Sequence, residues 1–186
     1  MPTQRNKEQR LANGGIGAIK QAILQCKACK FSGPVENRVI GKGSLKPILL
    51  FVGSSPGALE GGQLENMVKA LKLTSEQWAA TNYFKCPIKE PVFEEEFQAC
   101  SKFFGAQIYF LEPQAVVILG EIAIKGVTSR VIEYGEICEF GLNHWMIKVL
   151  PLEALDSASN IKKQKEYLNE FRRTLEQRSI LSPVYH

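Results

Sequence analysis

The sequence has few of the patterns that mark membrane proteins or common hydrolases. No apolar run approaches membrane-spanning length, and the polar first residues contain no apolar signal-peptide core. Only two histidines occur, His144 and His186, and the second is the last residue. Ser54 and Ser55 have no evident histidine partner, which argues against a serine nucleophile. We therefore expect a cytoplasmic protein without a membrane segment.

The motifs of nucleotide-binding proteins are also missing. The turn G-S-S-P-G at 53–57 has neither the G-K-[ST] of a P-loop nor the G-x-G-x-x-G of a dinucleotide fold. The net charge is only +4, which permits a nucleic-acid partner without demanding one. No segment is repeated or of low complexity. The chain of 186 residues predicts a polar arm over 1–12, one domain over 13–178 and a tail over 179–186.

Four of the five cysteines have a spacing typical of metal ligands. Cys26 and Cys29 are separated by two residues, and Cys86 and Cys100 follow after a long gap. Cytoplasmic thiols stay reduced, which favours a metal over disulfides. Four thiolates bind Zn²⁺ or an iron–sulfur cluster, and the spacing leaves both open. Four unrelated buried thiols are the alternative, but the polar, lysine-flanked first pair does not suit a core.

Apolar runs alternate with helical patterns along the rest of the chain. Buried strands are expected at 47–52, 79–84, 115–119 and 145–150, the last of them in a hairpin that begins at 134. Helices are expected at 14–27, about 64–71, 94–111 and 159–175, with a short one after Gly120. This alternation predicts a mostly parallel four-stranded sheet with helices on both faces.

Ligands of such a sheet bind outside the carboxyl ends of its strands. That rule selects residues 54–57, Asn82, 120–121 and 150–151. Asn82 could read a flat, amide-containing ring, because its side chain offers a donor and an acceptor side by side. From composition alone, a turn asparagine that bonds nearby backbone is the better explanation of Asn82.

Five segments in the right order together resemble the family-4 uracil-DNA glycosylases, the iron–sulfur branch of the uracil-DNA glycosylase superfamily. They are C-K-A-C at 26–29, I-L-L-F-V-G-S-S-P-G at 48–57, T-N-Y-F-K-C-P at 81–87, F-Q-A-C at 97–100 and V-V-I-L-G at 116–120. The resemblance implies a three-layer α/β/α sandwich and a DNA partner, single- or double-stranded. It also implies a [4Fe–4S] cluster on the four cysteines, with zinc as the alternative. The implied base site comprises Asn82, which would read uracil, with Gly53, Ser55 and Gly57 beside it.

The sequence departs from that family at the groups that perform the chemistry. The glutamate that positions the attacking water is replaced by Ser54, and the histidine that stabilises the departing uracil anion is replaced by Leu150. The segment with a uracil-stacking phenylalanine is largely missing after Gly57. Loss of an anion-stabilising donor costs about 10²–10³ in rate, and loss of an acid–base or water-positioning group roughly 10²–10⁴. We therefore expect a DNA-repair-related, iron–sulfur protein with weak or no base-excision activity.

Two other functions remain open from the sequence. One is an active DNA glycosylase, a hydrolase of N-glycosidic bonds, that acts on uracil or another damaged base with rewired residues. It would need Ser54, Ser55 or Glu121 to orient the water. The other is a non-enzymatic structural or partner-binding protein that never touches DNA.

Overall fold

The computed structural model describes residues 15–60, 62–129, 137–140, 145–150 and 158–182. Within these ranges, one sheet has the strand order β1-β3-β2-β4-β6-β5. The strands are β1 (Lys42–Gly43), β2 (Leu49–Gly53), β3 (Trp78–Asn82), β4 (Ala115–Leu119), β5 (Ile137–Phe140) and β6 (Trp145–Leu150). The central strands β3, β2, β4 and β6 are parallel, which confirms the predicted four-stranded core of the sheet. The short strands β1 and β5 pair antiparallel at its two edges.

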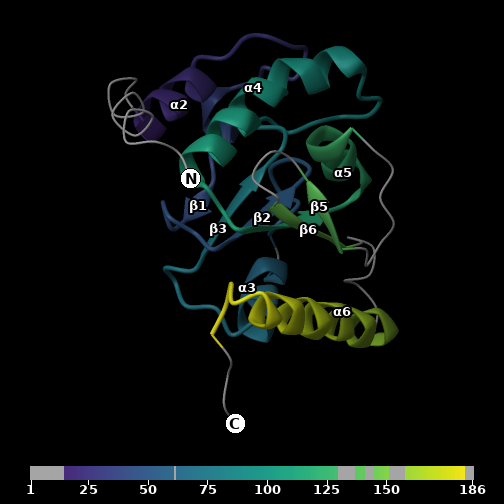
Figure 1. The fold of residues 1–186 in the computed structure, drawn as a ribbon. Helices are drawn as coiled ribbons and strands as arrows, with labels where there is room; N and C mark the ends of the chain where they lie inside the picture. Colours follow the sequence, from purple (N-terminus) through teal and green to yellow (C-terminus); the bar gives the residue numbers. More distant parts are fainter. Residues whose placement is uncertain (1–14, 61, 130–136, 141–144, 151–157, 183–186) are drawn as a thin grey trace.

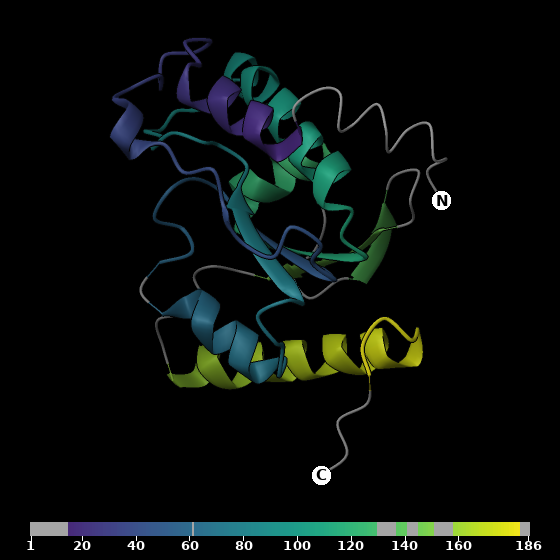
Figure 2. The same cartoon turned by 90° about the vertical axis from the view of Figure 1, so that its left-hand side faces the viewer.

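Helices cover both faces of this sheet. They are α2 (Gly15–Leu24), the 3-10 turn η1 (Val35–Asn37), α3 (Gln63–Ala70), α4 (Glu94–Leu111), α5 (Glu121–Thr128) and α6 (Ala158–Gln177). Helices α2, α4 and α5 lie on one face and α3 and α6 on the other, as the two views show (Figures 1 and 2). The three-layer α/β/α sandwich expected from the sequence is therefore confirmed.

Strand β2 supplies side chains to two apolar cores, one on each face of the sheet. Leu49 and Phe51 belong to the core that includes residues of α3 and α6, whereas Leu50 and Val52 belong to the core on the α4 side. All four side chains are fully buried. Strands buried on both faces read as continuous apolar runs, and this is why β2 is visible in the sequence.

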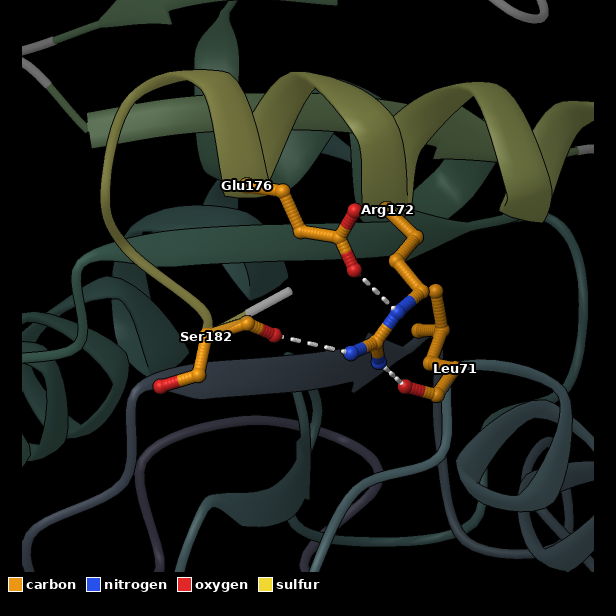
Figure 3. Close-up of polar contacts among 4 residues, drawn as sticks. All are labelled: Leu71, Arg172, Glu176 and Ser182. Atoms are coloured by element: carbon orange, nitrogen blue, oxygen red, sulfur yellow. Dashed lines mark hydrogen bonds and ion pairs between the residues drawn. The ribbon is translucent and has the colours of Figure 1, made fainter. Parts of the chain in front are cut away.

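Helix α6 is fastened to the α3 side of the sheet by one arginine. The Arg172 guanidinium donates to the backbone carbonyl of Leu71, at the end of α3, and to that of Ser182 at 3.2 Å. Its Nε donates to Glu176 at 2.7 Å, one turn along α6 (Figure 3). A cation at a helix C-terminus satisfies carbonyls that have no partner within the helix. Arg172 therefore joins α3, α6 and the segment that follows α6.

Several predicted boundaries need correction. The sequence predicts a loop at Lys42–Gly43, but these residues form β1, and the helix expected to reach residue 27 ends at Leu24. The hairpin of β5 and β6 is confirmed. The expected arm over 1–12 and the last four residues of the expected tail lie outside the described residues. Within the described ranges, no helix is both long and apolar enough to cross a membrane.

Candidate base-binding site and metal centre

The carboxyl ends of the four parallel strands lie in one row across the sheet. Asn82 at the end of β3 is opposite Gly53 at the end of β2, and Leu119 at the end of β4 is opposite Leu150 at the end of β6. Strands β2 and β4 pair in register up to the residue before these ends. The predicted positions 53, 82, 120 and 150 are thus brought to a single edge, where ligands of parallel sheets bind.

Asn82 carries an unsatisfied polar atom at this edge. The residue is 4% exposed, and its Oδ1 has no hydrogen-bond partner among the described residues. A buried acceptor without a donor is costly, since about nine tenths or more of buried polar groups are paired in folded proteins. The simple alternative, in which a turn asparagine bonds nearby backbone through this oxygen, does not describe Asn82. Its Oδ1 is an unpaired acceptor that a donor from a ligand would satisfy.

The backbone of Asn82 is held by a buried lysine. Lys85 Nζ donates to the Asn82 carbonyl, to Gln107 Oε1 on α4, and to Thr81 Oγ1 at 3.0 Å. Gln107 Nε2 in turn donates to the Ile40 carbonyl at 2.6 Å. Burial lowers the pKa of Lys85 to about 7. No local sequence pattern indicates this network, because lysine and glutamine are ordinarily surface residues.

The turn after β2 provides the other residues of the predicted base site. Ser54 and Ser55 are half-buried, and Gly57 is exposed with a φ of +95°. The Ser54 carbonyl accepts from Phe84 N at 2.9 Å, which anchors the turn to the segment after β3. Ser54 brings no carboxylate to the place where the family has one, and the backbone of Leu150 ends β6 along the same edge.

The four predicted metal ligands come from three parts of the fold. Cys26 and Cys29 follow α2, Cys86 follows β3, and Cys100 lies within α4. All four thiols, each in the described part of the chain, are free. Helices α2 and α4 lie side by side in both views (Figures 1 and 2), so the first cysteine pair is carried close to α4.

Arg38 fixes the loop that carries the first cysteine pair. Its guanidinium donates to the carbonyls of Ile23 at 2.9 Å, Leu24 at 2.6 Å and Gly33 at 3.0 Å. These bonds satisfy the last carbonyls of α2 and explain why the helix stops before Cys26. Arg38 Nε is buried and has no partner within the described residues, so it keeps one donor to spare.

The four thiols are close enough to influence one another electrostatically. Burial raises the pKa of Cys86, with a smaller contribution from Cys29 and Cys26, while the Arg38 guanidinium opposes it. Burial likewise raises the pKa of Cys100 to about 11, with Cys29 and Cys86 contributing. Thiols bind metals as thiolates, and burial disfavours the negatively charged thiolate form. A cationic metal centre among the four cysteines would offset this by stabilising the thiolates.

The donor set is that of a thiolate-bound metal centre. Across the described residues, no three His, Cys, Asp or Glu side chains already form a group that could hold one metal ion. Four thiolates can bind either a single Zn²⁺ or an iron–sulfur cluster. The residues that would hold it are Cys26, Cys29, Cys86 and Cys100, and the spare Arg38 donor lies on the same loop.

Fold and site together define an α/β/α protein whose parallel sheet presents a buried, unpaired amide oxygen at its carboxyl edge. The family model of the uracil DNA glycosylase superfamily matches residues 40–176, so the chain belongs to this superfamily. The matched range includes Gly53, Asn82 and two of the four cysteines.

The relatives that the chain matches are type-4 uracil-DNA glycosylases. It is 33% identical over 129 residues to that of Sulfurisphaera tokodaii, across 62% of this chain and 59% of the relative. It is 29% identical over 120 residues to that of Thermotoga maritima, across 58% of this chain and 62% of the relative. The match to that of Archaeoglobus fulgidus is 28% over 120 residues, across 58% and 60%. The resemblance drawn from the sequence is thereby confirmed, and the matched part spans about three fifths of these relatives.

Proposed function

We propose that this protein is an iron–sulfur member of the superfamily that binds a nucleic-acid base at Asn82 and excises it weakly or not at all. The observation that carries the proposal is the buried, unpaired Oδ1 of Asn82 at the carboxyl edge of the sheet. Uracil presents an N–H donor flanked by two carbonyl acceptors. A side-chain amide, with its acceptor and donor side by side, pairs with one such donor and acceptor.

Weak excision follows from the two replaced groups. Ser54 lacks the carboxylate that would position a water, and Leu150 has no polar atom to stabilise a departing anion. Loss of the anion-stabilising donor costs about 10²–10³ in rate and loss of the water-positioning group roughly 10²–10⁴, so the two together cost about 10⁴–10⁷ if they act independently. Of the base-site groups that the resemblance implies, Asn82 and the neighbouring Gly53 are retained at this edge of the sheet.

The four cysteines would hold the [4Fe–4S] cluster as a structural cross-link. Because they come from the loop after α2, the segment after β3 and α4, a bound cluster would join these three parts into one unit. Lys30 already connects the same segments, since its Nζ donates to the Pro91 carbonyl at 3.0 Å and lies 3.6 Å from Glu96.

DNA is the proposed partner because the family acts on it, and the mild positive charge of the chain is compatible with phosphates. Binding to single-stranded DNA should weaken as salt rises, with a slope set by the number of phosphates contacted. A salt-independent affinity, or no affinity, would favour the partner-binding alternative instead.

The deciding experiment is uracil release from a single-stranded, uracil-containing oligonucleotide by protein with full iron content. The enzyme is used in stoichiometric amount and the reaction followed for many hours, with Asn82→Ala as the control. We expect Asn82-dependent binding with release slower by orders of magnitude than in an active relative assayed in parallel. Efficient release that disappears in Asn82→Ala would overturn the proposal and establish a glycosylase with a rewired catalytic set.

A further inference from the structure

The Asn82 amide oxygen lies beside Gly53, close to two apolar side chains of the turn after β2. A Cβ atom placed on Gly53 would lie 2.7 Å from Asn82 Oδ1 and 3.0 Å from both Ala58 Cβ and Leu59 Cγ. The amide oxygen and two apolar carbons therefore surround one small point beside Gly53. Both side chains therefore lie near the oxygen, and neither carbon can donate a hydrogen bond to it.

Leu59 is held in this position by apolar packing. It is 8% exposed and belongs to the core on the α3 and α6 face, together with Leu64 and Met67 of α3. Closing the site with Leu59 thus gains apolar burial and leaves a buried acceptor unpaired. A base that donated to Asn82 Oδ1 would reverse this balance if Leu59 moved away.

The turn that carries the two side chains is bounded by left-handed glycines. Gly57 has a φ of +95° and Gly62 a φ of +80°, a conformation that glycine adopts without steric cost. Between them, Glu60 N donates to the Gly57 carbonyl at 3.1 Å, and this bond can move with the turn. Ala58 N donates to the Ser55 carbonyl at 3.0 Å, before Gly57, so displacement of the turn has to break or lengthen this bond.

We propose that Ala58 and Leu59 form an internal plug that closes the base site at Asn82 and is displaced when a base enters. This inference rests on the proposed base-binding function. In this proposal, the residues that remain in the shortened segment after β2 determine how often the Asn82 amide is accessible to a base.

The test measures base-dependent affinity rather than total DNA binding. The probe is a single-stranded oligonucleotide with one 2′-fluoro-deoxyuridine, in which fluorine slows excision, and the reference is the same strand with a tetrahydrofuran abasic analogue. The ratio of the two Kd values reports the contribution of the base, because phosphate contacts are shared. The variants are Leu59→Ala and Ala58→Gly, each alone and combined with Asn82→Ala. Leu64→Ala is the matched control, because it removes the same atoms from the same core.

If the plug is closed in most molecules, only the open fraction of the protein can bind the base. Removal of the plug then raises the uracil preference by up to the inverse of that open fraction. For Leu59→Ala we expect a gain in uracil preference on the order of tenfold. Ala58→Gly, which costs little core packing, should act in the same direction and shows the effect even if Leu59→Ala folds poorly. Leu64→Ala should leave the preference unchanged, and Asn82→Ala should remove it in every background.

Three results would overturn the plug, and they differ in what they say of the proposed function. If wild type prefers uracil through Asn82 but neither Leu59→Ala nor Ala58→Gly changes that preference, the plug is wrong and the base-binding function stands. If no variant shows an Asn82-dependent preference, both inferences fail. Equal gains in Leu59→Ala and Leu64→Ala would also exclude a plug, because loosening of the core would then explain them.

Discussion

Gly53 and Asn82 are partners across β2 and β3, and the missing side chain of Gly53 is what leaves room for the amide oxygen of Asn82. A methyl group at Gly53 would approach this oxygen to 2.7 Å, a distance that real Cβ contacts essentially never show. The Asn82 side chain can therefore keep its position only if residue 53 is a glycine.

Gly53→Ala should lower both stability and base recognition. The new methyl group forces the Asn82 side chain or the residues at 58–59 to shift, and overpacking of this kind costs about 1–3 kcal/mol. Urea denaturation measures the loss, and the uracil preference should fall toward the abasic reference. The control is Gly105→Ala on α4, where an added Cβ meets nothing within 4 Å. There we expect a gain of roughly 0.5–1 kcal/mol. Equal effects at the two sites would contradict the crowding described at Gly53.

Gln107→Leu should destabilise the protein by breaking the network beneath Asn82. Lys85 and Thr81 both donate to Gln107 Oε1, which lies on a buried side chain. Loss of this acceptor leaves buried donors with fewer partners, at a cost of about 1–3 kcal/mol. Gln98→Leu, at an exposed position of the same helix, is the control and should change the free energy of unfolding little. Similar losses in the two variants would argue that α4 tolerates leucine poorly everywhere.

Cys100→Ser should remove most of the iron and acid-labile sulfide from anaerobically purified protein, and Cys86→Ser should do the same. Serine cannot replace a buried thiolate ligand of a soft metal centre. The fifth cysteine gives the control: Cys138→Ser, on β5, should keep full iron content. Stoichiometric zinc without iron in the wild-type protein would disprove the cluster, and iron retention in Cys100→Ser would remove that residue from the ligand set.

Arg172→Ala should loosen α6 from the sheet. It leaves the carbonyls of Leu71 and Ser182 without their guanidinium donors and removes the pair with Glu176, for a loss of about 1–3 kcal/mol in the free energy of unfolding. Arg173 is exposed on the same helix, so Arg173→Ala should have almost no effect. Thermal unfolding in parallel distinguishes the two, and a null result for Arg172→Ala would mean that the apolar face of α6 suffices.

Leu150→His and Ser54→Glu together should raise the rate of uracil release. Position 150 ends β6 in the row that contains Asn82, and a histidine there supplies a hydrogen-bond donor that leucine lacks. Such a donor contributes about 10²–10³ in rate, and a carboxylate at position 54 adds roughly 10²–10⁴ if it positions water. The control is the triple variant that also carries Asn82→Ala. Unchanged release in the double variant would show that base binding, and not the chemical step, limits uracil release.

The sequence predicted the central elements closely where one pattern dominates. Strand β4 was predicted at its observed bounds because five apolar residues leave no other reading, and α4 because its first turn is acidic and its apolar residues recur at helical spacing. Strand β1 was missed, since Lys42 and Gly43 carry no apolar signal. Pairing with β3, and not propensity, makes them a strand.

The sequence predicted where the residues of the candidate site lie in the fold, but not their hydrogen bonds or their packing. The carboxyl-edge rule brought Asn82 and Gly53 to the right place, yet only the folded chain shows that the Asn82 oxygen is unpaired and that Leu59 packs near Gly53 beside it. The sequence indicates no role for Arg38 or Lys85. Their roles depend on carbonyls that are distant in sequence, and no local pattern contains that information.

The two-residue strand β1 also has a consequence for how copies of this protein meet one another. An exposed sheet edge is a template on which a strand from another molecule can add, and this is a common route to aggregation. Here the β3 edge is covered by Lys42, a charged residue, and by Gly43, whose φ of +103° departs from extended backbone. A side chain at Gly43 would approach the Trp78 carbonyl to 2.6 Å, so this short cover fits β3 only with a glycine. An incoming strand finds two residues to pair with, one of them charged and the other bent away from a strand conformation.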